Sequence, residues 1–230
     1  MDHVKEKIGE AAASFVQDGM VIGLGTGSTA AFFIRALAKR YEKEGLNIVT
    51  VASSYQSEIL AKDLGIPFVH IDAINAIDIT FDGADEIDDE WHLIKGAGGA
   101  LLREKILISA SKEFIVLCDE TKCVKKLGSA LLPVEVVPFG HSLTAMYFQE
   151  VANSFTLRKR GDGRVFVTDC QHFIYDLQLK PELTDFEALE TKLLKIPGVV
   201  ETGLFLHHAT KVILGYKDLT IKILSQKRGV

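Results

Sequence analysis

The chain has 230 residues, of which 47% are hydrophobic and 25% are charged, and its formal net charge is −5. This balance is typical of a globular protein and excludes a largely disordered chain. No block of lysine and arginine residues is long enough to follow a phosphate backbone, so we expect no nucleic-acid partner.

Cysteine usage and the N-terminal sequence both favour a cytoplasmic protein. The three cysteines, Cys118, Cys123 and Cys170, are too few for a disulfide framework, which indicates a reducing compartment. They have no second ligand pair at metal-site spacing, so we expect no metal. Residues 1–7 are charged, and there is no apolar run of about eighteen residues, so we expect neither a signal peptide nor membrane contact.

Apolar periodicity in the first half of the chain predicts alternating helices and strands. The predicted helices are 4–15, 29–37, 54–64 and 100–111, and the predicted strands are 20–24, 47–52, 68–71, 77–81 and 113–118. Strands that are apolar on both sides and alternate with helices are typical of a mostly parallel sheet covered on both faces. Ligands of such sheets bind at the carboxyl ends of the strands, so we expect the chemistry in the loops there.

The pattern changes at Leu132-Pro-Val-Glu-Val-Val-Pro138. Downstream we predict helices over 143–152 and 185–195, a hairpin of 155–160 with 165–169 turned by Gly161-Asp-Gly163, and strands over 173–179, 199–206, 211–216 and 220–224. The order strand-helix-strand-strand-helix-strand is ferredoxin-like. The predicted fold is α/β: a Rossmann-like, mostly parallel sheet domain of residues 1–131 plus 207–230, with a smaller ferredoxin-like α+β domain of residues 132–206 inserted before the C-terminal strands.

The first glycine-rich motif, Gly23-Leu-Gly-Thr-Gly-Ser-Thr29, lies between a predicted strand and a predicted helix. Glycines let a ligand approach the backbone closely, and the N–H groups at a helix start attract an anion. The motif is neither a Walker A loop, since no Lys-Ser/Thr pair follows, nor a dinucleotide fingerprint, since Ser28 replaces the third glycine. The hydroxyls of Thr26, Ser28 and Thr29 suit a phosphate monoester. The alternative is a tight turn before a helix with Ser28 as its N-cap.

The second motif, Asp82-Gly-Ala-Asp-Glu-Ile-Asp88, directly follows an apolar strand. We expect Asp82 and Asp85 to point into the same space at the carboxyl end of that strand. An EF-hand is excluded because Ala84 occupies a required ligand position. The motif is either a solvated acidic turn or a pair of carboxylates that bind sugar hydroxyls and move protons.

The third motif, Lys95-Gly-Ala-Gly-Gly-Ala-Leu-Leu-Arg-Glu-Lys105, joins a glycine-rich loop to a predicted helix. At 100° per residue, Glu104 falls on the apolar arc of this helix and Lys105 on a different arc. The apolar arc contains Ala100, Leu101, Leu107 and Ile108. Partial desolvation there should raise the pKa of the Glu104 carboxyl towards the range of a general base. The alternative is a purely structural ion pair of Glu104 with a nearby lysine or arginine.

Two further polar clusters follow predicted strands. Ser53-Ser-Tyr-Gln-Ser57 can add a hydroxyl to a phosphate site or simply cap a helix, and Lys122 of Asp119-Glu-Thr-Lys122 can reach a phosphate or a carboxylate. The seven histidines show neither a triad nor metal-site spacing, and we interpret them as surface or packing residues.

Taken in order, these motifs resemble the type A ribose-5-phosphate isomerase family. Leu132-Pro-Val-Glu-Val136 and Pro197-Gly-Val-Val-Glu-Thr-Gly-Leu-Phe205 extend the resemblance across most of the chain. It implies an aldose-ketose isomerase that interconverts D-ribose 5-phosphate and D-ribulose 5-phosphate through a cis-enediol(ate), in the non-oxidative pentose phosphate pathway. It further implies a sugar-phosphate substrate, no metal or organic cofactor, and a homodimer or homotetramer.

The resemblance also assigns roles to residues. Glu104 matches the general base that moves a proton between C2 and C1. Asp82, Asp85 and Lys95 match residues that help to open the furanose ring and hold the sugar oxygens, and Lys95 can offset charge on the enediolate. The residues that match the substrate-binding set are Gly25, Thr26, Gly27, Ser28, Thr29, Ser53, Gly96, Gly98 and Lys122.

The chain departs from the family pattern at three places. Thr168-Asp-Cys-Gln-His172 stands where members commonly read Thr-Asp-Asn-Gly-Asn, Leu102 replaces a frequent Thr, and Pro138-Phe-Gly-His-Ser142 lacks an Arg often found there. All three lie outside the acid/base set, so they bear on the small domain and on phosphate affinity rather than on the reaction.

Two rival functions lead to different measurements. An amino-sugar phosphate deaminase of similar fold would release ammonia, and a sugar-phosphate sensor would bind without turnover. Sensors normally carry a DNA-binding segment, and this chain has no basic helix-turn-helix. The intact set of Glu104, Asp82, Asp85 and Lys95 also favours an isomerase.

Overall fold

The computed structural model describes residues 1–226, and the chain forms two compact units. Unit 1 comprises Met1–Ala84, Arg103–Cys123 and the stretch that begins at His208; unit 2 comprises Asp85–Leu102 and Val124–His207. Residues 227–230 of the range 207–230 expected for the first domain lie outside the described residues. The division into domains at 131/132 and 206/207 stays a prediction. The compact units group residues 85–102 and 124–131 with the α+β part.

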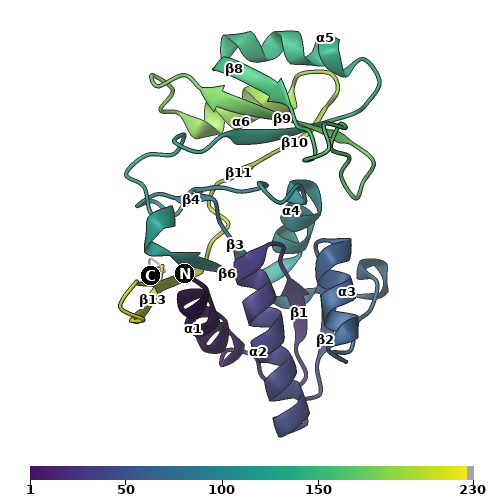
Figure 1. The fold of residues 1–230 in the computed structure, drawn as a ribbon, viewed down its shortest axis with the longest axis vertical. Coiled ribbons are helices and arrows are strands. Elements are labelled where there is room, and N and C mark those ends of the chain that lie inside the picture. Colours follow the sequence, from purple (N-terminus) through teal and green to yellow (C-terminus); the bar gives the residue numbers. More distant parts are fainter. Residues whose placement is uncertain (227–230) are drawn as a thin grey trace. The chain divides into compact units, whose positions relative to one another are not determined.

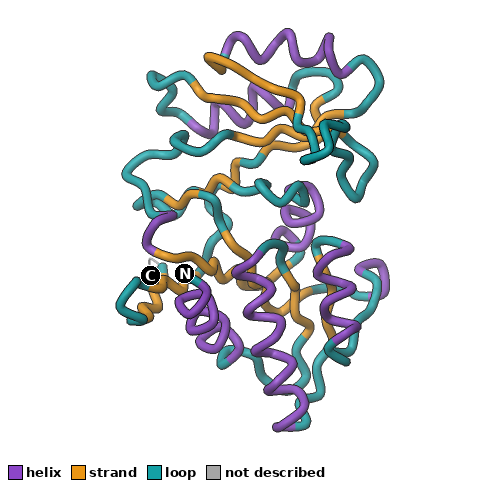
Figure 2. The backbone as a smooth tube through the Cα atoms, viewed as in Figure 1, coloured by secondary structure: helices purple, strands orange, loops and turns teal. Residues whose placement is uncertain are grey.

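Unit 1 alternates helices and strands along the chain, as the sequence predicts (Figures 1 and 2). Its helices are α1 (Asp2–Ala13), α2 (Ser28–Glu44), α3 (Tyr55–Asp63) and most of α4 (Leu101–Ser109), with short 3-10 helices η1 (Ile71–Ala73) and η2 (Glu120–Lys122). Its strands are β1 (Val21–Leu24), β2 (Val49–Ala52), β3 (Ile77–Gly83), β6 (Ser111–Asp119), β12 (Lys211–Gly215) and β13 (Ile221–Ser225). They form one sheet in the order β13-β12-β6-β3-β1-β2, parallel except for β12 with β13. The predicted mostly parallel sheet is confirmed.

Helices α1 and α2 lie side by side and cover the sheet with their apolar residues (Figure 1). Ile8 of α1 and Phe33 of α2 are fully buried in the same cluster as Phe81 of β3, whose ring stacks on Phe33. The close approach of the two helices requires Gly9, because a Cβ there would lie 2.7 Å from the backbone of Phe32. This packing fixes the start of α2 against the sheet.

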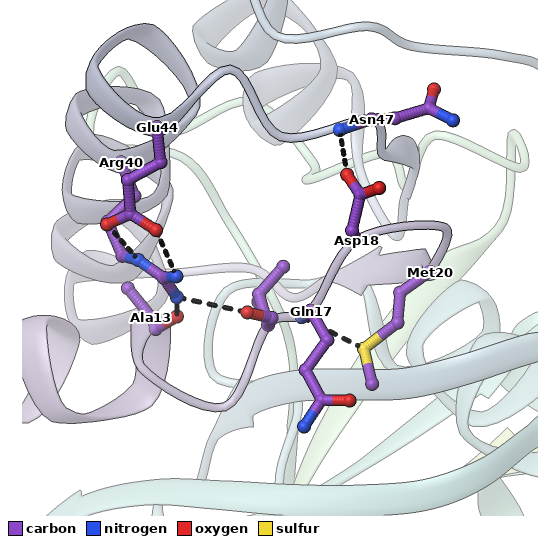
Figure 3. Close-up of polar contacts among 8 residues, drawn as sticks. Ala13, Gln17, Asp18, Met20, Arg40, Glu44 and Asn47 are labelled. Carbon is purple, nitrogen blue, oxygen red and sulfur yellow. Dashed lines mark hydrogen bonds and ion pairs between the residues drawn. The ribbon is translucent and has the colours of Figure 1, made fainter.

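Polar contacts hold the turn between α1 and β1 (Figure 3). Arg40 donates to the carbonyl oxygens of Ala13 and Val16, the latter at 3.0 Å, and its Nε donates to Glu44 at 2.8 Å. The Ala13 carbonyl lies at the C-terminal end of α1, where it also accepts the N–H of Val16 at 3.2 Å. The turn is thereby ordered, and it fixes where β1 begins.

Unit 2 contains two small sheets. Its elements are β4 (Glu86–Ile87), β5 (Leu93–Ile94), β7 (Leu132–Val136), α5 (His141–Met146), η3 (Tyr147–Glu150), β8 (Ala152–Leu157), β9 (Phe173–Leu179), α6 (Phe186–Leu194), β10 (Val199–Thr202) and β11 (Leu204–Phe205). The four-stranded sheet is antiparallel in the order β10-β7-β9-β8, and the other has the order β11-β5-β4. The run β7-α5-β8-β9-α6-β10 confirms the predicted ferredoxin-like order.

Three predicted elements differ from the structure. Residues 68–71 form no strand, and only Phe68 makes an isolated parallel bridge, to Thr50. The predicted hairpin 155–160 with 165–169 is confirmed only next to its turn, where Lys159 and Val165 form an antiparallel bridge flanked by two backbone hydrogen bonds, because β8 pairs with β9 instead.

The predicted strand 199–206 is broken at Gly203 into β10 and β11, which join different sheets. A Cβ at Gly203 would lie 2.4 Å from the carbonyl oxygen of Lys95, and its N–H donates to the carbonyl of Pro133 at 2.7 Å. Only glycine permits this close approach, so the strand switches sheets there.

Unit 2 buries a carboxylate, Glu135 of β7, which is only 1% exposed. Thr168 Oγ1 donates to Glu135 Oε1 at 2.9 Å, and His172 Nδ1 lies 3.0 Å from the same oxygen. Burial raises the pKa of Glu135, while the hydrogen bonds from Thr168 and His172 act in the opposite direction. Two residues of the segment that departs from the family pattern thus hold this buried acid.

Replacing Thr168 with Val should destabilise the protein in a pH-dependent way. Because the native pKa of Glu135 is raised, the folded state holds that proton more tightly than the unfolded state, so folding stability falls as pH rises through the native pKa. Removing the Thr168 donor raises the pKa further, so we expect a loss of about 1–3 kcal/mol at pH 7 and a smaller loss at pH 4. Urea denaturation at both pH values measures this, and an equal loss at both would contradict the account.

Gln171 adopts a left-handed backbone conformation with φ 65°, at the position where the family commonly has glycine. A non-glycine residue in this conformation lowers the folding stability by about 1–2 kcal/mol. Glycine avoids this cost, but it loses more conformational entropy on folding, which offsets part of the gain. We expect Gln171→Gly to stabilise the protein by about 0.5–1 kcal/mol in urea denaturation. Gln178→Gly, in β9, should destabilise it. A destabilising Gln171→Gly would show that the side chain makes a compensating contact.

Candidate functional site

The centre of the unit 1 site is the carboxylate of Asp82, which is 0% exposed at the carboxyl end of β3. Its Oδ1 accepts the N–H of Thr26 at 3.0 Å and that of Gly83 at 2.7 Å. A Cβ at Gly25 would lie 2.2 Å from Asp82 Oδ1, so only glycine fits beside this carboxylate. The first two predicted motifs therefore meet at neighbouring strands, β1 and β3.

Serine hydroxyls from the end of β2 support the same loop. Ser53 Oγ lies 2.7 Å from Thr26 Oγ1 and 3.1 Å from the carbonyl oxygen of Leu24, and Ser57 Oγ donates to the carbonyl of Gly25 at 2.6 Å. Ser53 is only 1% exposed. These contacts favour a role for Ser53 in shaping the loop. Ser54 caps α3, as the cap alternative for this cluster predicts.

The start of α2 differs from the prediction. Gly27, at φ 101°, is the N-cap residue and makes no side-chain cap, while Ser28 is the first helical residue. The prediction of Ser28 as N-cap is therefore wrong, because glycine takes the positive-φ turn that precedes the helix. Gly27 and Ser28 are exposed, so the start of this 17-residue helix faces solvent as an anion-attracting terminus.

Sequence reasoning missed Lys5 of α1, whose Nζ donates to Ser28 Oγ at 2.8 Å. This contact places an ammonium group at the start of α2, beside the exposed loop. The signal was present in the helical wheel, because Lys5 lies on the arc of Ile8, Gly9 and Ala12, all of which are buried. A lysine in the middle of a buried arc is unusual enough to indicate a partner.

Glu104 lies in the first turn of α4 and is only 3% exposed. The predicted burial is thus confirmed, and its neighbours on the predicted arc are buried as well: Ala100, Leu101, Leu107 and Ile108. Lys105, which the helical wheel assigns to a different arc, is also buried at 9% exposure. The N-terminal end of a helix favours a nearby negative charge, so the position suits an ionised base.

Within unit 2, Asp85 contacts the glycine-rich loop that follows β5. Asp85 Oδ2 accepts the N–H of Ala97 at 2.9 Å. The N–H of Lys95 donates to the carbonyl of Gly203 at 2.9 Å, and its Nζ lies 5.3 Å from the ring centroid of Phe205. Lys95 is 3% exposed, so its ammonium group is largely desolvated and acts strongly on any nearby charge.

Two glycines of this loop adopt positive φ, 105° at Gly96 and 81° at Gly99. The N–H of Gly99 donates to the carbonyl of Gly96 at 2.9 Å, which closes a tight turn. A Cβ at Gly99 would lie 2.4 Å from the ring of Phe166. Ala97 and Gly98, between the two glycines, are exposed and leave the turn open to a ligand.

Lys122 is half-buried in η2, just after β6.

Within unit 1, the nearby Cys118 thiol has a pKa well above its usual range, because it is hydrogen-bonded to Cys123 and is buried. The thiol therefore stays protonated and is poorly nucleophilic. Cys118 is therefore a structural thiol.

Residues 1–226 lack two features. In that described part, no group of three or more His, Cys, Asp or Glu side chains is arranged to hold a metal ion. None of its helices is both long and apolar enough to cross a membrane.

The family model described as ribose 5-phosphate isomerase A (phosphoriboisomerase A) matches residues 49–219. A second model, the DeoR C-terminal sensor domain, matches residues 2–73.

Similar proteins carry the same description over nearly their full lengths. The ribose-5-phosphate isomerase A of Enterococcus faecalis is 46% identical over 216 residues, which cover 94% of this chain and 95% of that protein. The solved ribose 5-phosphate isomerase A of Methanocaldococcus jannaschii has a TM-score of 0.91 at 40% identity, covering 97% of this chain and 98% of that one. A D-ribose-5-phosphate isomerase solved in complex with phospho-erythronic acid has a TM-score of 0.92 at 37% identity, with the same coverage. The chain belongs to the ribose-5-phosphate isomerase A family.

Proposed function

We propose that this chain interconverts D-ribose 5-phosphate and D-ribulose 5-phosphate through a cis-enediolate, with Glu104 as the general base. The observation that carries the proposal is the burial of Glu104 in the first turn of α4, directly after a glycine-rich loop. A buried carboxylate is poorly solvated, so it is a stronger base towards a carbon-bound proton than one in water. Glu104 takes the proton from C2 and, after exchange of that proton with solvent, delivers a proton to C1.

The remaining roles follow from charge and hydrogen bonding. Lys95 offsets the negative charge that develops on the enediolate oxygens. Asp82 and Asp85 exchange protons with sugar hydroxyls, which opens the furanose ring, and hold the open chain. Lys122 adds a further cation for the phosphate.

The phosphate anchor is the start of α2. The exposed residues Gly27 and Ser28 and the ammonium group of Lys5 offer backbone N–H groups, a hydroxyl and a positive charge to one anion. The phosphate loop also includes Gly25, Thr26 and Thr29. Ser53 supports it through the contact of its hydroxyl with that of Thr26. Binding energy from the unreactive phosphate orients the reacting carbons.

The ligand in one relative supports the enediolate route. Phospho-erythronic acid is a four-carbon sugar acid phosphate, and the relative was solved in complex with it. Its planar, anionic carboxylate resembles the planar O1–C1–C2–O2 group of an enediolate. A site that stabilises such an intermediate binds this shape and charge more tightly than it binds the sugar.

The match to the DeoR sensor domain supports the rival hypothesis of a sugar-phosphate sensor. It covers residues 2–73, which contain the phosphate loop but not Asp82, Lys95 or Glu104. A shared anion-binding loop accounts for the match without a shared function. The isomerase is therefore the function that the whole chain supports best.

We also propose that the protein acts in the cytoplasm, in the non-oxidative pentose phosphate pathway, as a homodimer or homotetramer. An apolar surface on unit 2 supports self-association. Phe139 is 93% exposed, and Leu143, Met146 and Tyr147 are each more than half exposed. Light scattering of the purified protein gives its mass directly, and a monomer would contradict the oligomer proposal.

The purified chain should convert ribose 5-phosphate to ribulose 5-phosphate in excess EDTA without added cofactor, and release no ammonia from amino-sugar phosphates.

Glu104→Gln should lower kcat by about 10²–10⁴-fold with KM within a few-fold, because the amide keeps the shape but cannot take a proton. Glu58→Gln, on the exposed ion pair with Lys62, serves as the control. A folded wild type that binds the sugar phosphate without turnover would favour the sensor, and an active Glu104→Gln would remove Glu104 from the base role.

Lys5→Met should weaken substrate use through the phosphate. Loss of a charge-assisted contact of about 1.5–3 kcal/mol predicts a fall in kcat/KM of roughly 10–100-fold. Lys7→Met is a matched control on the same helix, because Lys7 pairs with Glu10 at 2.8 Å instead. Steady-state kinetics of both variants measures this. An equal change in kcat/KM in the two variants would show that Lys5 only connects α1 to α2 and does not bind the phosphate.

A further inference from the structure

Arg158 of unit 2, just after β8, is held in one orientation by a carboxylate of β9. Its Nε donates to Asp176 Oδ2 at 2.8 Å, and its Nη2 donates to Asp176 Oδ1. The two side chains are only 13% and 15% exposed. A bidentate pair of this kind fixes the plane of the guanidinium group, which an ammonium group cannot reproduce.

The remaining guanidinium nitrogen, Nη1, binds the glycine-rich loop. It donates to the carbonyl oxygen of Gly96 at 2.9 Å and to that of Ala97 at 3.1 Å. The ring of Phe166, whose centroid is 5.8 Å from the guanidinium carbon, occupies the space beside Gly99. One side of the loop is therefore held by Arg158 and Phe166.

The two carbonyl contacts determine where the N–H groups of the loop point. In a trans peptide the C=O and the N–H lie on opposite sides of the chain. The Gly96 carbonyl faces Arg158, so the Ala97 N–H points away from it, and this N–H donates to Asp85 at 2.9 Å. By the same geometry, the Ala97 carbonyl contact turns the Gly98 N–H to the side opposite Arg158.

Such an arrangement needs an external holder, because the loop itself is permissive. Gly96 and Gly99 both have positive φ, and glycine moves readily between backbone conformations. Without the guanidinium, the Gly96–Ala97 peptide keeps its bonds to Gly99 and Asp85, whereas the Ala97–Gly98 peptide loses the contact that orients it. The Gly98 N–H would then lose its fixed direction.

We propose that Arg158 is a positioning residue for the isomerase reaction, in which it fixes the peptide planes of Gly96 and Ala97 so that the loop presents the Gly98 N–H to the enediolate. The role rests on the proposed function, since it concerns groups that stabilise that intermediate. Arg158 itself touches no substrate. Its effect passes through the loop, and Asp176 acts one step further back by orienting Arg158.

The test compares Arg158→Lys and Arg158→Ala with Arg160→Lys and Arg160→Ala, since Arg160 is exposed on the same segment. We expect the Arg158 variants to lose roughly 10–100-fold in kcat while KM stays within about threefold, because a preorganised donor acts mainly on the transition state. Guanidinium ion should restore part of the activity of Arg158→Ala and none of any loss in Arg160→Ala. A kcat within twofold of wild type in Arg158→Lys, or a loss that appears only in KM, would overturn the proposal.

A second readout does not depend on turnover. Hydrogen–deuterium exchange of the peptide containing residues 95–101 should quicken in Arg158→Lys and stay unchanged in Arg160→Lys. Unchanged exchange in Arg158→Lys would overturn the positioning role even if the wild type proved inactive. An inactive wild type would contradict the proposed function instead, so the two failures are distinguishable.

Discussion

The unit 1 site depends on one close contact, that of the buried Asp82 carboxylate with the backbone of the loop after β1. A carboxyl group at 0% exposure is tolerated only where hydrogen bonds replace water, and the N–H groups of Thr26 and Gly83 do so. The contact excludes any side chain at Gly25. It thereby fixes the direction in which the chain leaves β1 and enters α2, and so the position of the phosphate loop.

The same principle recurs in unit 2 with different residues. The loop after β5 is rich in glycine, and its conformation is fixed from outside by Asp85 on an N–H group and by Arg158 on two carbonyls. Glycine supplies the positive φ and the room for a ligand, while charged side chains supply the rigidity that glycine lacks. In both loops the backbone is therefore accessible to a ligand and is held in one conformation. Catalysis on a small anion requires both properties.

Local pattern was sufficient to predict much of this protein. The parallel sheet, the buried face of α4 with Glu104 and the ferredoxin-like order all follow from apolar periodicity over long segments. The two-residue strands β4 and β5 were missed because two residues are too few to show a period. The predicted hairpin forms only next to its turn for a different reason: its turn residues are favourable, but β8 pairs over its length with the longer strand β9.

Contacts between distant residues were the least predictable part of the site. Lys5 of α1 contacts Ser28 of α2, and Arg158, which follows β8, contacts Gly96 in a loop distant in the sequence. Neither contact lies within a local sequence motif. Lys5 did leave a sequence signal, a lysine on a buried helical arc. Arg158 left none, because nothing in the sequence near it indicates that Asp176 and the loop carbonyls lie within its reach.

Isotope exchange with solvent tests the central claim most directly, that the chain isomerises its substrate by proton transfer through Glu104. The reaction is run in deuterium oxide and stopped at low conversion, and deuterium at C1 of ribulose 5-phosphate is measured by NMR. We expect solvent deuterium in the product of the wild-type protein, and product and exchange both lower by about 10²–10⁴-fold with Glu104→Gln. Product formed without any solvent deuterium would indicate a direct hydride shift from C2 to C1 and would contradict the enediolate mechanism.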